Sequence, residues 1–335
     1  MRTSPHGAEA FASYRARRVL VTGGTGLIGR QLVRLLCDAG ARVTAVSLDD
    51  VEVEPRAERV FGDLTDYSFC TRLTADTDFV FHVAGIKGSV EVTKRRPASF
   101  FVPLMMMNTN VLEACRVNQV QKVLYTSSIG AYSSRESFSE LEDDGSGVPM
   151  DTFPGWAKRM GELQVQAYRI EHGLENFAVV RPSNVYGPGD NFDPATAMVI
   201  PALMSRIRSG EDPVVVWGDG SAVRDFIYSE DVARGMLLAL HHGTDSRPVN
   251  LGSGVGVSVA ELVETLKTIV PFNYRFDPSG PGGFPRRVMD MTLARQRLGF
   301  VPATSLASGL RQTWDWYAAH SDEHLKKQNY FRSRR

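Results

Sequence analysis

Residues 19–40 read VLVTGGTGLIGRQLVRLLCDAG, and this stretch decides the fold. The apolar run Val19–Val21 suits a buried strand, and apolar residues then recur at helical spacing. Between them lie Gly23, Gly26 and Gly29. Glycine is needed where the chain turns tightly and where backbone approaches a pyrophosphate, and the following helix directs its first N–H groups at the phosphates. The stretch predicts a dinucleotide-binding loop; a tight turn without a ligand is the alternative.

The bulk composition limits the class of protein. The chain has 335 residues, enough for a full core and two lobes, and its formal net charge is zero. This balance does not indicate a nucleic-acid or membrane partner. No apolar run approaches the ~18 residues of a membrane helix, and residues 1–17 lack a signal-type apolar stretch. We therefore expect a cytoplasmic protein with a flexible N-terminal tail (1–17) and a basic C-terminal tail (321–335).

Three scattered cysteines, Cys37, Cys70 and Cys115, stand in apolar surroundings. Their odd number and their spacing fit reduced thiols packed in helices. We expect neither a disulfide framework nor a metal site.

Strand and helix signals alternate over the first half of the chain. Strands are expected at 18–22, 42–47, 59–61, 79–83, 122–126 and 177–181, and helices at 27–39, 66–74, 98–117 and 155–172. This alternation predicts an α/β fold with a doubly wound parallel sheet (Rossmann) and helices on both faces. We assign residues 18–182 to the dinucleotide-binding domain, with 230–252 returning to it. Frequent Gly and Pro indicate a smaller C-terminal lobe, made of 183–229 and 253–320, that binds the substrate.

The end of the second strand bears on the choice between NAD and NADP. An acidic side chain there usually bonds the adenosine ribose, whereas an arginine favours the 2′-phosphate of NADP. The strand ends at Ser47, which suits either form, and Asp49 follows it. A carboxylate at Asp49 repels a phosphate, which favours NAD and leaves NADP as the alternative. Asp63 can bond the adenine edge or serve only as a helix N-cap.

Several motifs follow the glycine loop in a fixed order. They are GDL at 62–64, FHVAG at 81–85, YTSSIGAY at 125–132, WAKRMGE at 156–162, RPSNVYGPGDNF at 181–192 and GDGSAVRDFIYSEDVA at 218–233. Over residues 18–320 the chain thereby resembles the extended short-chain dehydrogenase/reductases, and among them the NAD-dependent nucleotide-sugar epimerase/dehydratase family. The segments at 84–114 and 188–203 are most similar to the GDP-fucose synthase branch.

The resemblance implies a bound NAD(P) and a set of residues that hold it. The implied cofactor-binding residues are Gly23, Thr25, Gly26, Leu27, Ile28, Gly29, Ser47, Asp49, Asp63, Leu64, Ala84, Gly85, Lys158 and Pro182. The implied partner is a nucleoside-diphosphate sugar, at a hydroxyl of which hydride is transferred.

The catalytic group implied by the resemblance is a Ser, a Tyr and a Lys, with three residues between Tyr and Lys. Positions i and i+4 share a helix face, and an ammonium beside a phenol lowers the pKa of the phenol so that it can exchange a proton with a sugar hydroxyl. Ser128 matches the Ser, and Lys158 matches the Lys, which also bonds the nicotinamide ribose. Pro154 stands at the Tyr position. Proline moves no proton, but it suits a first helical turn capped by Asp151 or Thr152.

Two further departures narrow the chemistry. The 4,6-dehydratases of the family have an Asp-Glu pair where this chain has Ile129 and Gly130, and the fucose-synthase branch has a Cys and a His where it has Gly130 and Met198. A substitute acid/base is therefore needed. The candidates are Lys87, Tyr132, Asp151, Thr152 and Tyr186. Lys87 is counted among the catalytic residues because a desolvated amine can act near neutral pH; a phosphate or backbone contact is the alternative.

The substrate lobe contains arginines at positions that hold a nucleoside diphosphate in the family. Arg224 is the clearest of them, and one of the pair Arg286–Arg287 is the second. A diphosphate needs guanidinium forks and neutral donors such as Asn184. Surface ion pairs are the alternative for the arginines. Further substrate contacts are expected at Ser127, Tyr132, Val199 and Trp217, with core packing as the alternative for Trp217.

Met105–Met107 lie on a helix that often packs against a second subunit in the family. We expect a homodimer through helices 98–117 and 155–172, with core packing as the alternative. The predicted function is an NAD(P)-dependent epimerase or oxidoreductase with an atypical acid/base. A catalytically weakened NAD- and NDP-sugar-binding protein, acting as sensor or partner subunit, is the second hypothesis. A reductase of a non-sugar alcohol or ketone is the third, and the arginines disfavour it.

Overall fold

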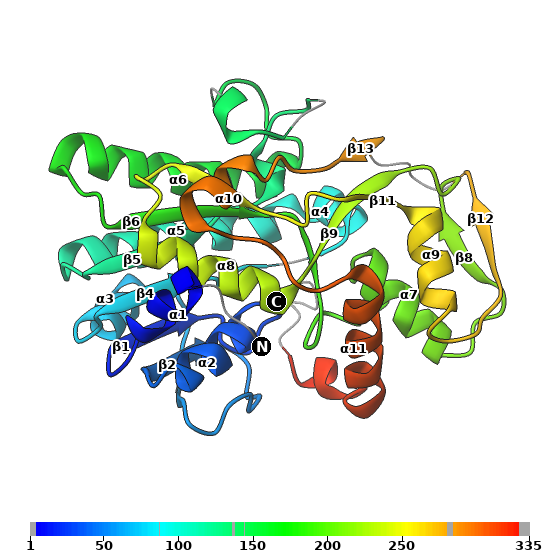
Figure 1. The fold of residues 1–335 in the computed structure, drawn as a ribbon, viewed down its shortest axis with the longest axis horizontal. Coiled ribbons are helices and arrows are strands. Elements are labelled where there is room, and N and C mark those ends of the chain that lie inside the picture. Colours follow the sequence, from blue (N-terminus) through cyan, green and yellow to red (C-terminus); the bar gives the residue numbers. More distant parts are fainter. Residues whose placement is uncertain (1–4, 87, 136–137, 144, 280–283, 328–335) are drawn as a thin grey trace.

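The computed structural model describes residues 5–86, 88–135, 138–143, 145–279 and 284–327 of the chain. Its central element is a parallel seven-stranded sheet (Figure 1). The strands are β1 (Arg18–Thr22), β2 (Arg42–Ser47), β3 (Glu58–Phe61), β4 (Phe79–His82), β5 (Lys122–Thr126), β6 (Phe177–Pro182) and β10 (Pro248–Leu251). Their order is β10-β6-β5-β4-β1-β2-β3, so the chain winds in both directions from β1. The predicted doubly wound α/β fold is confirmed.

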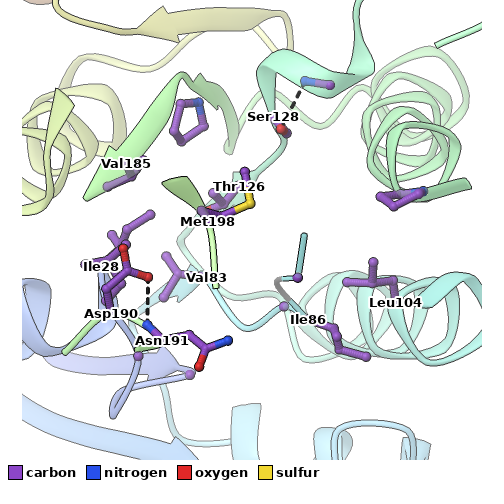
Figure 2. Close-up of a pocket in the computed structure, with 18 of the residues that line it drawn as sticks. Ile28, Val83, Ile86, Leu104, Thr126, Ser128, Val185, Asp190, Asn191 and Met198 are labelled. Atoms are coloured by element: carbon purple, nitrogen blue, oxygen red, sulfur yellow. Dashed lines mark hydrogen bonds between the residues drawn. The ribbon is translucent and has the colours of Figure 1, made fainter. Parts of the chain in front are cut away.

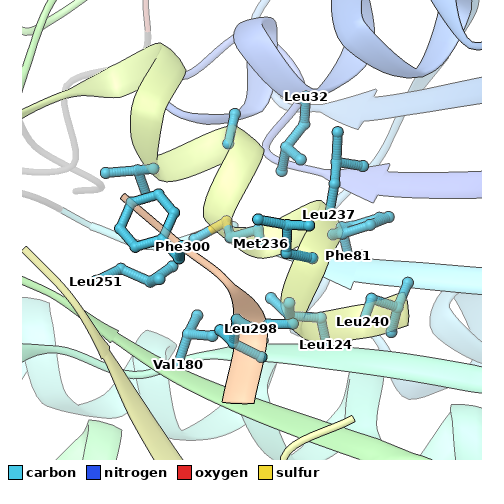
Figure 3. Packing of buried hydrophobic residues seen from close by; sticks show 14 of the residues in the cluster. Leu32, Phe81, Leu124, Val180, Met236, Leu237, Leu240, Leu251, Leu298 and Phe300 are labelled. Atoms are coloured by element: carbon cyan, nitrogen blue, oxygen red, sulfur yellow. The ribbon is translucent and has the colours of Figure 1, made fainter. Parts of the chain in front are cut away.

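Helices cover both faces of this sheet, because its strands carry apolar side chains on both sides. Val19 and Val21 of β1 point into one core, and Leu20 points into the other. The first core is covered by α1 (Pro5–Ala12), α2 (Gly29–Asp38), α8 (Ser229–His242) and α10 (Thr292–Leu298), and the second by α3 (Tyr67–Thr74), α5 (Pro97–Val117) and α6 (Thr152–His172). Figure 3 shows the first core, where helix side chains meet Phe81 and Val180 of the sheet. Over the described residues, none of the helices is both long and apolar enough to span a membrane.

The remaining strands form two smaller sheets. One contains β7 (Asn184–Tyr186), β9 (Val223–Tyr228), β11 (Gly256–Ser258) and β13 (Arg286–Arg287), and the other pairs β8 (Val214–Trp217) with β12 (Tyr274–Asp277). The helices α7 (Val199–Arg208), α9 (Val259–Lys267) and α11 (Leu306–Ala319) enclose a third core with them. Shorter helices are α4 (Val90–Arg95) and the 3₁₀ turns Ile129–Ala131, Glu140–Glu142 and Glu323–Lys326.

The three cysteines lie on helices, as expected: Cys37 on α2, Cys70 on α3 and Cys115 on α5, each with a free thiol. Burial raises the pKa of the Cys70 thiol to about 12, so this thiol is protonated and unreactive at neutral pH. No group of three or more His, Cys, Asp or Glu side chains in the described ranges could hold a metal ion.

The N-terminal segment differs from the expected loose tail. Residues 5–12 form α1, and Ala10 and Tyr14 are buried in the first core. The hydroxyl of Tyr14 donates a hydrogen bond of 2.6 Å to the carbonyl of Leu237 in α8. The expectation was wrong because this segment is held by contacts with α8, more than 200 residues away in the chain, rather than by a helical pattern of its own.

Residues near 289–300 also depart from the expected lobe boundary. Met289, Leu298 and Phe300 are buried in the first core with the residues of the large sheet. Figure 3 shows Leu298 and Phe300 beside Leu251 of β10 and Met236 of α8. Placing the whole of 253–320 in the substrate lobe was therefore wrong, since the chain returns to the large sheet through α10.

Candidate functional site

A cleft of about 1670 Å³ borders the carboxyl ends of the large sheet, including those of β1 and β4, where the strand order reverses. Figure 2 shows part of it, with Ile28 and Val83 on one side and Ser128 and Met198 on another. Pockets for one small ligand commonly measure roughly 300–1,000 Å³. The cleft is therefore large enough for a dinucleotide together with a second ligand.

The glycine loop forms one wall of the cleft. Gly23 has φ +68°, and a Cβ there would lie 2.8 Å from the Cα of Ala84, which follows β4. A Cβ on Gly29 would lie 2.1 Å from the carbonyl oxygen of Gly23, so only glycine lets α2 begin against this loop. Ile28, at the N-cap of α2, provides no side-chain cap. The uncapped helix end and the side-chain-free loop fit the phosphates of a dinucleotide.

All fourteen residues predicted to bind the cofactor border this cleft. At the end of β2 the hydroxyls of Thr25 and Ser47 lie 2.7 Å apart, and the Thr25 hydroxyl also donates to Asp49 at 3.2 Å. Asp63 accepts from the backbone N–H and the hydroxyl of Thr65 at 2.9 and 2.8 Å. It does not cap the next helix, because Asp66 is the N-cap of α3.

Ser128 and Lys158 both border the cleft. The Lys158 ammonium donates a 2.7 Å hydrogen bond to the carbonyl of Thr126 and lies 5.5 Å from the ring centre of Tyr125. Burial lowers the pKa of Lys158 to about 8, although Glu162 acts in the opposite direction. The Ser128 hydroxyl accepts from the backbone N–H of Gly130 at 3.1 Å. The third predicted catalytic residue, Lys87, lies outside the described residues.

The first turn of α6 contains Pro154, as predicted, but its cap differs from the expectation. Asp151 is at the N-cap position, yet its side chain makes no capping bond. It instead accepts from a guanidinium nitrogen of Arg287 at 3.0 Å. Thr152 is already the first residue of the helix, so neither predicted cap is present.

Two arginines from neighbouring strands lie beside Asp151. Arg224 of β9 and Arg287 of β13 are register partners. Arg287 borders the cleft, whereas Arg224, the clearest of the predicted diphosphate residues, and the exposed Arg286 do not. Arg224 donates to the carbonyls of Val223 and Phe284 at 2.8 and 2.6 Å. Burial, and then repulsion from Arg287, lowers the pKa of Arg224 to about 10. Two guanidinium groups beside one carboxylate leave an excess of positive charge that suits an anion.

Some of the other predicted substrate residues border the cleft, and others do not. Ser127, Asn184 and Val199 border the cleft, and the Asn184 amide donates to the carbonyl of Asp225 at 2.9 Å. Tyr132 does not: it is fully buried and its hydroxyl donates to Asn250 at 3.0 Å. Trp217 is 55% exposed at the end of β8 and is not part of the cleft wall. The prediction for Tyr132 was wrong, because the fold buries its side chain in the first core, whereas a substrate contact at Trp217 stays a prediction.

A segment near the C-terminus also borders the cleft, which the expected solvated tail does not explain. Glu323 pairs with Arg30, which directly follows the glycine loop, and with Lys327 at 3.6 Å. The Lys327 ammonium donates to the carbonyl of Gly189 at 2.7 Å. We call residues 323–327 the C-terminal strap. The basic composition of the tail led to the prediction of a solvent-exposed segment. These contacts could not be predicted, because they join residues far apart in the chain and have no local sequence pattern.

Lys158 is expected to react with amine-directed reagents at a pH where an ordinary lysine is almost fully charged. With a pKa of about 8 it loses its proton as the pH rises through that value, so about half of it is neutral at pH 8. Labelling followed by peptide mass spectrometry should show the Lys158 signal rising between about pH 7 and pH 9. A Lys158 signal that rises only near pH 10 would contradict the expectation.

The chain matches the profile of the "NAD dependent epimerase/dehydratase family" over residues 19–252. It is 32% identical over 328 residues to the probable GDP-L-fucose synthase 1 of Oryza sativa subsp. japonica, covering 93% of this chain and 95% of that protein. It is also 32% identical over 323 residues to a dTDP-4-dehydro-6-deoxy-D-allose reductase of a Streptomyces species, covering 92% and 98%.

The chain is also similar in fold to a solved structure. UDP-glucose 4-epimerase from Thermotoga maritima, solved with UDP-glucose, is 30% identical and has a TM-score of 0.80. The match covers 90% of this chain and 99% of that one. The similarity therefore includes the large sheet and most of the smaller lobe.

Proposed function

The chain belongs to the NAD-dependent epimerase/dehydratase family, and from this premise we propose that it is an NAD(P)-dependent enzyme that transfers hydride at a hydroxyl of a nucleoside-diphosphate sugar. The reaction is an epimerisation or a net oxidation or reduction of the sugar. The observation that carries the proposal is a single cleft bordered by the glycine loop, by Ser128 and Lys158, and by Arg287. This arrangement allows a dinucleotide and a charged sugar nucleotide to be bound side by side.

The cofactor typical of the family is NAD(P), which supplies a hydride acceptor and donor when bound. The loop Gly23–Gly29 and the uncapped start of α2 would hold its phosphates. The Asp49 carboxylate at the end of β2 favours NAD over NADP, because a 2′-phosphate there would be repelled. Lys158, fixed by the Thr126 carbonyl, would hold the nicotinamide ribose.

At the reacting end, the Ser128 hydroxyl would hydrogen-bond the reacting sugar oxygen and so orient it. Arg287, supported by Arg224 on the neighbouring strand, would hold the diphosphate of the substrate. Binding the diphosphate at a fixed distance from Ser128 places the sugar between them.

A second candidate function is a binding protein without turnover, which acts as a sensor or partner subunit. Pro154 favours it, because the resemblance assigns this residue to the position of the family's catalytic Tyr and proline moves no proton. Loss of one general acid/base commonly lowers a rate by ~10²–10⁴-fold rather than abolishing it. The enzymatic function is therefore preferred.

The experiment is a panel of GDP-, UDP- and dTDP-sugars, because the relatives' names contain all three bases. Purified protein loaded with NAD or NADP is incubated with each sugar, and both NADH absorbance and product sugars are followed. Turnover of one nucleotide class is expected. Tight binding of a nucleotide sugar without any turnover would favour the second candidate. A protein that binds neither NAD nor NADP would contradict the proposal altogether.

We also propose a homodimer, on the basis of an exposed apolar stripe on α5 and α6, which pack against each other. The stripe consists of Val102, Met106, Phe153, Trp156, Met160 and Leu163, each at least 36% exposed. Their spacing of three or four residues places the α6 members on one face. Two copies that join these faces would form a four-helix bundle.

Met160→Glu is expected to convert the dimer into a monomer, because a charge in the middle of the stripe would be buried without a partner. Light scattering after size-exclusion chromatography measures the mass. Val301→Glu is the matched control, since Val301 is 68% exposed and outside the stripe. A wild-type protein that is already a monomer would contradict the proposed dimer.

A further inference from the structure

We propose that the carboxylate of Asp151 is the proton acceptor and donor of this cleft, in the role left open by Pro154. The inference rests on the proposed function above and names the residue that moves the proton. Asp151 borders the same cleft as Ser128, Lys158 and Arg287.

Asp151 is the N-cap residue of α6, but its side chain does not make the hydrogen bond that an N-cap aspartate usually makes. Such a residue normally accepts a bond from the second or third helical N–H, as Asp66 does from Phe69 at the start of α3. Asp151 makes no such bond. Thr152, the next residue, has φ +46°, a left-handed conformation that a β-branched residue rarely adopts. The backbone is thus strained at the residue that follows Asp151, whose carboxylate lies beside Gly130 at the cleft wall.

Gly130 makes room for the carboxylate. A Cβ built on Gly130 would lie 2.3 Å from Oδ2 of Asp151, so this oxygen occupies the volume that any larger residue at 130 would fill. The first turn of α6 packs closely against Gly130, because a Cβ on Gly155 would lie 2.4 Å from the carbonyl oxygen of Gly130. Ser128 bonds the N–H of the same Gly130 through its hydroxyl. Asp151 and Ser128 therefore flank one residue at the cleft wall.

One oxygen of the carboxylate is free to take a proton. Arg287 donates to Oδ1 at 3.0 Å, and Oδ2 accepts no hydrogen bond from the part of the chain that the structure describes. The side chain is 36% exposed within the cleft. A diphosphate bound by Arg287 would draw this guanidinium away and free Oδ1 as well. Substrate binding and release of the base are thereby coupled through one arginine.

Five other proton-bearing groups in or near the cleft are less suited. Tyr132 is fully buried and bonded to Asn250. Tyr186 is 2% exposed, and burial raises the pKa of its phenol. The carboxylates of Asp63, Asp190 and Asp193 hold their own loops by accepting from the N–H of Thr65, Asn191 and Ala195.

In the oxidative direction, the sugar O–H bond breaks and its proton passes to Oδ2 of Asp151. The carbinol C–H bond would break with its electron pair, which leaves as hydride, and the C=O bond would form. A nicotinamide cofactor held by the glycine loop and Lys158 would supply the hydride acceptor for this oxidation of the sugar. In the reverse direction Asp151 returns the proton to the oxygen as the carbon regains hydride.

The test compares wild-type holoenzyme with Asp151→Asn on the nucleotide sugar found in the panel. The kcat of Asp151→Asn is expected to fall by about 10²–10⁴-fold, with cofactor affinity unchanged. KM should stay equal or fall, because the variant removes a negative charge beside Arg287. Asp151→Glu should recover part of the rate, because it restores a carboxylate at this position. Asp66→Asn, a cap outside the cleft, is the matched control and should retain full kcat.

A wild-type kcat in Asp151→Asn would overturn the inference and leave the proposed function standing. A wild-type protein that turns over no nucleotide sugar would overturn both. Gly130→Ala provides an independent measurement, because its methyl group displaces Oδ2. It should lower kcat in the wild-type background and have no further effect on Asp151→Ala. Losses that multiply in the double variant would contradict a role of Gly130 through Asp151.

Discussion

Replacing Arg181 with leucine is expected to lower the free energy of unfolding by about 3–5 kcal/mol. The Arg181 side chain is 3% exposed and donates to both oxygens of Glu162, at 2.7 and 2.6 Å, and to Asp143 at 2.5 Å. Its guanidinium also lies 4.2 Å from the ring centre of Tyr132. Leucine would leave the buried Glu162 carboxylate without its cation and Asp143 with Arg135 as its remaining partner.

Urea unfolding followed by circular dichroism measures this loss. Arg169→Leu is a matched control on α6, because Arg169 pairs with Glu175, which is 73% exposed. An exposed ion pair contributes about 0–1 kcal/mol. Equal destabilisation by the two variants would mean that the buried cluster contributes nothing beyond a surface pair.

Arg287→Met is expected to weaken binding of GDP, UDP or dTDP, whichever nucleotide the protein recognises, by about 100-fold. A hydrogen bond to a charged group contributes about 1.5–3 kcal/mol, and each 1.4 kcal/mol is tenfold in affinity. The variant also leaves the Asp151 carboxylate facing the diphosphate without its cation. Isothermal titration with the nucleoside diphosphate alone measures the effect independently of turnover.

Arg286→Met is the control for this experiment. Arg286 is adjacent in sequence and carries the same charge, but it is exposed and does not border the cleft. Its substitution should change the affinity by less than about threefold. Similar losses in both variants would indicate a general effect of charge rather than a diphosphate contact.

The large sheet was predictable because its strands are short apolar runs followed by glycine or polar residues. The six predicted strands from 18–22 to 177–181 correspond to β1–β6 with ends that differ by at most one residue. The helix α1 was not predicted, because its stability depends on Tyr14 reaching Leu237. The return of the chain through α10 was missed for the same reason: only the tertiary fold brings Leu298 and Phe300 to the sheet.

The same distinction holds within the site. The predicted cofactor residues follow strand ends, and parallel strands bring their carboxyl ends to one edge. Of the arginine pair, the structure selects Arg287, because the pairing of β13 with β9 sets it beside Arg224. Tyr132 was misplaced because neither motif nor composition says which way its side chain points. The role proposed for Asp151 could not be predicted from the sequence, because only the tertiary fold brings Oδ2 of its carboxylate against Gly130.

The C-terminal strap contacts Arg30 and the carbonyl of Gly189, which are themselves neighbours, because a Cβ on Gly189 would lie 2.1 Å from Nε of Arg30. Arg30 directly follows the glycine loop, and its side chain is 10% exposed. Removing residues 323–327 would therefore leave this guanidinium without the Glu323 carboxylate, next to the loop that begins α2.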